Sequence, residues 1–221
     1  MANLKDLGFS ENVIVETIVS TYNQDGQPNA APMGATMKNE QTVILRLFNS
    51  SLTFKNLQLN RCAVINVTSN IDLFYKTTFK ETNPDGTLPQ EWFEKAQTVN
   101  APRLHAADAI IEVSVANLKP IDADKTQATC QVKMVKATND LPKVYCRAFS
   151  ATLEAIVHAT RVKAFVGNKN KRVELDKLLT LIGDCNNVVN KTAPNSRYCE
   201  IMTELNSLIN SWRRANDESL H

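Results

Sequence analysis

The stretch from residue 25 to residue 68 constrains the fold more than any other part of the chain. Asp25-Gly26 is typical of a turn, and residues 28–35 leave it as a segment of small apolar residues. Residues 43–48 are β-branched and apolar, and residues 62–68 have the same character. The sequence therefore predicts a series of strands, with one helical segment between the last two.

Arg46 is the only charged residue in the predicted strand 43–48, and cap residues follow that strand directly. A short helix over 52–60 therefore begins where the strand ends. Its free backbone N–H groups, the hydroxyls of Ser51 and Thr53 and the Arg46 cation would converge where a phosphate can bind. Two other interpretations stay open: Arg46 pairs with Glu16 of the predicted first strand 13–22, or Glu16 faces solvent.

Composition places the chain among ordinary globular proteins. Its 221 residues are 43% hydrophobic and 22% charged, with a net charge of +2. That charge is small, and no basic run alternates with aromatic residues, which argues against nucleic-acid binding. We find no apolar stretch near 18 residues and no apolar leader, so neither membrane insertion nor secretion is indicated and a cytoplasmic protein is expected.

Cysteine and histidine usage argues against a metal site. The three histidines, His105, His158 and His221, form no closely spaced pair. The five cysteines include no CxxC pair and are expected to be reduced thiols in strands and helices. Dinucleotide, P-loop and esterase fingerprints are also absent from the sequence.

The rest of the chain divides near Leu141-Pro142. Before this point, a helical segment at 71–79, a loop at 81–88 and a short helix at 89–96 precede a hairpin of strands 107–118 and 126–136. This insertion between two predicted barrel strands, called the excursion below, has two interpretations: it covers a ligand, or it is an ordinary surface feature. Residues 1–10 are expected to be a loose lead-in. Beyond residue 141, period-3.6 patterns predict helices over 144–165, 173–189 and 197–212.

The order of these elements resembles the FMN-binding split β-barrel superfamily. Segments 16–21, 30–34, 46–48, 51–57, 64–68 and 154–161 are similar to an uncharacterised archaeal flavoprotein family within it, domain of unknown function 447. The resemblance implies an α+β protein, with a mainly antiparallel, Greek-key-like split barrel over 1–140 and a helical unit over 141–221. It also implies FMN as cofactor and a homodimer with the flavin near the subunit interface.

A flavin requires anion recognition, a flat apolar slot and hydrogen bonds to its pyrimidine edge. The resemblance gives the phosphate to Arg46, Ser51 and Thr53. It gives the remaining contacts to the ring-facing residues Pro32, Met33, Gly34 and Ala35, to the polar edge at Val19, Ser20, Thr21 or Asn66, and to Phe48. Each position also has a plain structural interpretation: Ser51 is a helix cap, Ser20 and Asn66 satisfy strand backbone, and Gly34 is a bulge.

Bound flavin supplies the hydride chemistry itself, so a flavin enzyme needs no nucleophilic side chain of its own. Three functions stay open: an FMN-dependent oxidoreductase acting on an unidentified small molecule, a non-catalytic FMN carrier or sensor, and a structural interaction module. The helix at 144–165 adds a charged stripe that faces the flavin, a dimer partner or solvent. Its members are Arg147, Glu154, His158 and Arg161.

Overall fold

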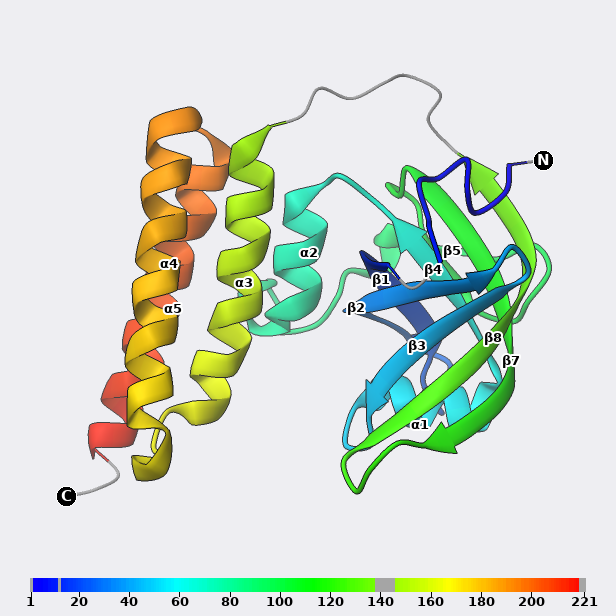
Figure 1. Cartoon of the computed structure of the whole chain (residues 1–221), viewed down its shortest axis with the longest axis horizontal. Helices are drawn as coiled ribbons and strands as arrows, with labels where there is room; N and C mark the ends of the chain where they lie inside the picture. Colours follow the sequence, from blue (N-terminus) through cyan, green and yellow to red (C-terminus); the bar gives the residue numbers. More distant parts are fainter. Residues whose placement is uncertain (1, 12, 138–145, 219–221) are drawn as a thin grey trace. The chain divides into compact units, whose positions relative to one another are not determined.

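The computed structural model describes residues 2–11, 13–137 and 146–218. The chain forms two compact units, Met1–Leu141 and Pro142–His221, which are described separately. The first is a β-barrel with short helices and the second is helical (Figure 1). The predicted α+β class, a barrel followed by helices, is confirmed.

Six antiparallel strands close the barrel in the order β1-β2-β3-β8-β7-β4, with β4 pairing back onto β1. The predicted hairpin is the β7–β8 pair, and it lies between β3 and β4. Closure leaves no free sheet edge in the barrel. The strands are β1 (Ile14–Tyr22), β2 (Pro28–Asn39), β3 (Thr42–Phe48), β4 (Cys62–Val67), β7 (Ala109–Pro120) and β8 (Lys125–Ala137).

Alternating side chains divide the barrel into an apolar interior and an outer face. In β3, Val43, Leu45 and Leu47 are buried in the core, whereas Arg46 and Phe48 are exposed. The expected loose lead-in is wrong, because Leu4 and Phe9 are buried in the same core. Their apolar side chains are the reason: burying them favours docking of the N-terminal segment against the barrel.

Helix α1 (Leu52–Asn60) lies across one end of the barrel (Figure 1). The hydroxyl oxygen of Ser51 accepts a hydrogen bond from the Phe54 N–H at 3.1 Å, so Ser51 is the N-cap. Leu57 points into the core, and Arg61 ends the helix in the left-handed conformation with φ of 55°. The strand-to-helix junction predicted from Asn49, Ser50 and Ser51 is therefore present.

The excursion between β4 and β7 holds helix α2 (Ile71–Thr78), two 3-10 turns, η1 (Lys80–Thr82) and η2 (Gln90–Trp92), and a small hairpin. Of the short helix predicted over 89–96, only the 3-10 turn η2 is present, since β5 (Phe93–Lys95) pairs there with β6 (Pro102–Leu104). Three-residue strands are too short for periodicity to identify, and tertiary contacts decide them.

Two buried polar side chains of the barrel hold this excursion in place. Asn66 donates to the Ile18 carbonyl at 2.8 Å and accepts from the Leu104 N–H at 2.8 Å. The Glu112 carboxylate, fully buried, accepts from the N–H groups of Gln97 at 2.8 Å and Thr98 at 2.5 Å. These bonds satisfy groups that would otherwise be costly to bury.

The helical unit consists of α3 (Arg147–Phe165), the turn η3 (Lys169–Lys171), α4 (Arg172–Thr192) and α5 (Arg197–Glu218). The three predicted helices are present, although the predicted start of the first at residue 144 lies outside the described residues. The alanines Ala148, Ala155 and Ala159 of α3 are buried. Within the described part of the chain, no helix is long and apolar enough to cross a membrane.

Replacing Asn66 by alanine should lower the free energy of unfolding by about 3 kcal/mol, because it leaves a buried N–H and a buried carbonyl without partners. Urea unfolding of the variant measures the loss. Asn117→Ala, at an exposed position on β7, is the matched control and should change stability by less than about 0.5 kcal/mol. Equal stability of the two variants would show that Asn66 does not anchor β6.

Candidate functional site

The N-terminus of α1 offers unused hydrogen-bond donors. Among the described residues, the backbone N–H groups of Leu52 and Thr53 have no acceptor. The Ser51 hydroxyl oxygen accepts from Phe54, which leaves its proton available for an outside acceptor. The helix dipole adds a partial positive charge at this end. These groups together favour an anion.

A buried polar cluster lies beside this helix end, where β1 stops and β2 starts. Thr21 and Asn29 are register partners on the two strands, and both are buried. The Asn29 amide donates to the Thr53 hydroxyl at 3.5 Å, and the Asn56 amide donates to the Thr21 hydroxyl at 2.9 Å. Helix and strands are therefore joined by polar side chains at this end, in place of the apolar contacts of the core.

Lys80 supplies the cation of this cluster. Its ammonium group, which follows α2, donates to the Asn29 side-chain oxygen. Burial lowers the pKa of Lys80 from its ordinary value of 10.5, and in the described part of the chain no carboxylate offsets that effect. A half-buried cation whose protein partner is a neutral amide is well suited to an anionic ligand.

Sequence reasoning missed Lys80, and no local signal identifies it among the lysines of the chain. It follows a helix of eight residues and enters the cluster only through the tertiary fold. The position of Asn56 could have been predicted, because it lies three residues after Thr53 and hence on the same helix face. Two polar residues at that spacing, on a helix closing a barrel, indicate a polar contact with the strand ends.

Arg46 lies apart from these groups, on the exposed outer face of β3. Glu16 is also exposed and pairs in register with Gly34, and the neighbouring Ala35–Leu45 pair places Arg46 in the same row across β1, β2 and β3. Gly34 is in regular pairing, so the bulge interpretation is wrong. A Cβ at position 34 would lie 2.8 Å from the Ile14 Cγ2 atom. The close approach expected at this glycine is therefore made by a side chain of β1.

The other residues predicted to contact the flavin ring or its pyrimidine edge lie in different surroundings: some are in the core, some beneath β6 and some on the outer face. The side chains of Val19 and Ala35 are buried in the barrel core, so only their backbone can contact a ligand, whereas Met33 is half-buried and packs against the core. Ser20 and Asn66 lie beneath β6, where Ser20 donates to the Pro102 carbonyl. These two polar groups are engaged by the protein itself. Pro32 is half-buried and Phe48 exposed, both on outward positions.

Cys130 is a buried thiol of the barrel, and the charged stripe of α3 belongs to the helical unit. Burial raises the pKa of Cys130, in the barrel core, to about 12. In α3, Arg147, Glu154 and Arg161 are exposed, and the Nε2 atom of His158 lies 3.9 Å from a Glu154 carboxylate oxygen. No group of three or more metal-ligating side chains occurs in the regions that the structure describes.

Comparison with known proteins identifies the family. The model of the DUF447 N-terminal domain, a protein family of unknown function, matches residues 15–155. An FMN-bound protein of the same family from Methanosarcina mazei is 30% identical, with a TM-score of 0.74 over 92% of this chain and 98% of that chain. Nitrilotriacetate monooxygenase component B from Bacillus cereus shares the fold alone, at 13% identity and a TM-score of 0.50 over 62% and 76% of the two chains. The family resemblance inferred from sequence is confirmed, and the chain belongs to the DUF447 family.

Proposed function

We propose that this chain binds FMN, with the phosphate at the N-terminus of α1. The proposal rests chiefly on one observation: a half-buried lysine ammonium whose protein partner is a neutral amide, next to a helix end with unused N–H groups. The FMN bound by the 30% identical relative from Methanosarcina mazei supports the choice of ligand. A phosphate dianion would neutralise Lys80 and accept hydrogen bonds from the N–H groups of Leu52 and Thr53.

The rest of the cofactor would extend from this point along β2. At about 3.3 Å per residue, Pro32 lies roughly 10 Å along the strand from Asn29, a separation that the five-carbon ribityl chain can bridge. The outward position Pro32 carries no long flexible side chain and suits a flat ring, with the Ile14 side chain over Gly34 beside it. Arg46 and Phe48, exposed on the neighbouring strand, would then border the ring on its open side.

Bound FMN supplies hydride transfer, so the residues of the chain bind and orient the cofactor. We infer an FMN-dependent oxidoreductase of a small molecule, with the cofactor in the barrel domain 1–140 and the helical domain 141–221 as a separate unit. A non-catalytic FMN carrier or sensor is the alternative. In either case the chain acts in the cytoplasm, as the sequence predicts.

The purified protein should be yellow and hold about one FMN per chain, because the phosphate site and ring face are built into each barrel. Absorbance and flavin extraction measure this content. Anaerobic mixing with a reduced nicotinamide or a reduced deazaflavin should then reduce the flavin, which is seen as loss of its absorbance within the time of a turnover assay. Bound FMN that neither donor reduces would favour the carrier or sensor, and a colourless protein that cannot be loaded would overturn FMN binding.

Lys80→Gln should weaken FMN binding by roughly ten- to a hundredfold, since a charge-assisted contact is worth about 1.5 to 3 kcal/mol. Riboflavin lacks the phosphate and should bind the wild-type and variant proteins alike. Arg46→Gln removes the same charge from an exposed position and is the matched control. Titration of both flavins by fluorescence decides the matter. Weaker binding of FMN, but not of riboflavin, in Arg46→Gln alone would assign the phosphate to Arg46. Weaker binding of both flavins in Arg46→Gln would instead indicate that Arg46 forms a structural ion pair with Glu16.

The pH dependence of the same titration isolates the amine. Because the pKa of Lys80 is lowered in the free protein, its charge is present below that pKa and is lost as pH rises through it, at a lower pH than for an exposed lysine. The preference for FMN over riboflavin should fall over that range in the wild type. It should be flat in Lys80→Gln.

We also propose a homodimer with the flavin near the subunit interface. The outer face of the barrel carries exposed apolar side chains, Ile14 at 61% and Phe48 at 59% exposure, beside the proposed ring face. A two-fold pair would bury them and is the commonest closed assembly. Light scattering at micromolar protein should give about twice the 24.6 kDa of one chain. A Phe48→Glu variant should shift the mass toward one chain, and a wild-type monomer would refute the dimer.

A further inference from the structure

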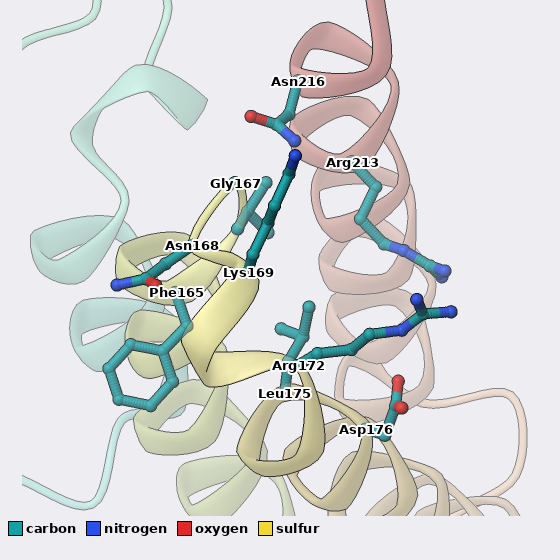
Figure 2. Close-up of a pocket in the computed structure, with 10 residues that line it drawn as sticks. Phe165, Gly167, Asn168, Lys169, Arg172, Leu175, Asp176, Arg213 and Asn216 are labelled. Carbon is teal, nitrogen blue, oxygen red and sulfur yellow. The ribbon is translucent and has the colours of Figure 1, made fainter. Parts of the chain in front are cut away.

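A cavity of about 240 Å³ opens at one end of the helical unit, where three segments meet (Figure 2). The α3–α4 connection forms one wall, the first turns of α4 form another, and the last turns of α5 form the third. Half-buried Val166 and Leu175 make part of the lining apolar. The cavity lies entirely within residues 165–216 and has no residue in common with the proposed flavin site.

Gly167 allows the connection to approach α5 this closely. Its φ of +88° is a conformation that other residues rarely adopt, and an added Cβ would lie 2.4 Å from the Asn216 side-chain oxygen. Figure 2 shows Asn216 above Gly167, with the Lys169 side chain extending toward it. The wall between the connection and α5 thus depends on a residue without a side chain.

Cations dominate the polar lining. Lys169, Arg172 and Arg213 line the cavity against a single carboxylate, that of Asp176. The guanidinium groups of Arg172 and Arg213 extend in the same direction from α4 and α5 (Figure 2). Among the residues that the structure describes, none of these three cations lies within ion-pair distance of a carboxylate. Their charges are therefore available to a ligand.

The excess of positive charge in the chain lies in the helical unit, and the barrel unit carries a net negative charge. Residues 142–221 contain 12 Lys and Arg against 8 Asp and Glu, a net charge of +4, whereas residues 1–141 contain 13 against 15, a net charge of −2. Between residues 161 and 172 there are five cations and no acidic residue. The cavity opens within this local excess, which raises the local concentration of anions.

We propose that this cavity binds a small phosphate monoester. The two guanidinium groups match a phosphate dianion, since arginine forms paired hydrogen bonds with phosphate, and the Lys169 ammonium adds positive charge to the same lining. The apolar lining at Val166 and Leu175 would contact the organic part of the ester. A volume of about 240 Å³ is below the range of roughly 300–1,000 Å³ typical of drug-sized ligands, which favours a compact ester over a nucleotide.

Calorimetric titration of the full chain, loaded with one equivalent of FMN so that the proposed flavin site is filled and little free phosphate ester competes, tests the proposal with phenyl phosphate and inorganic phosphate as probes. Phenyl phosphate should bind more tightly because of the apolar lining. Arg213→Gln and Arg172→Gln should each weaken it about tenfold or more. Their matched controls, Arg214→Gln and Lys177→Gln, remove the same charge from exposed positions outside the cavity and should change affinity less than threefold.

Three outcomes would overturn the proposal. The first is no binding of either probe at millimolar concentration. The second is equal loss in the cavity variants and their controls, which would indicate a diffuse electrostatic effect. The third is a single-stranded oligonucleotide that binds far more tightly than phenyl phosphate and is weakened alike by all four substitutions, which would assign a nucleic-acid surface instead.

Discussion

Closure of the six-stranded barrel is the constraint on which the rest of the first unit depends. In the closed antiparallel sheet β1, β2 and β3 alternate in direction, so the end of β1 and the start of β2 lie at the same barrel end as the junction of β3 with α1. The core at this end is covered by a helix, and that helix begins there with unpaired N–H groups. The proposed phosphate site at this barrel end would thus follow from the alternating strand directions of the closed sheet.

The placement of Lys80 carries a free-energy cost that a ligand can offset. Burial disfavours its charged form, and the Asn29 amide compensates only in part. A phosphate bound beside it would restore the charged form and, by binding the folded state alone, stabilise the barrel. The proposed site would therefore select for a ligand carrying phosphate over one that lacks it.

The sequence predicted the barrel strands well because continuous β-branched runs and clear cap residues report local structure directly. It failed where structure is decided by distant contacts. Leu4 and Phe9 become core residues only through docking on the barrel, and β5 pairs with β6 because Asn66 and Glu112 hold the excursion. Lys80 shows the same limit, because it is unremarkable in sequence and yet lies in the polar cluster. Arg46, conspicuous in an apolar strand, is exposed on the outer face, and its role at the phosphate stays a prediction.

The absence of familiar catalytic motifs from the sequence agrees with a protein whose cofactor would carry the reaction. A flavin needs from its protein a phosphate anchor, a flat face and exclusion of competing contacts, and backbone N–H groups, hydroxyls and amides provide these without a distinctive pattern. Thr21, Asn29, Thr53 and Asn56 fit that description: each is common in proteins, and only their burial together at one barrel end distinguishes them. Sites of this kind are defined by the fold that assembles them, so the family is recognisable from its order of elements. Of the proposed site, the sequence named Thr21 and Thr53, whereas Asn29, Asn56 and Lys80 are brought to it only by the three-dimensional structure.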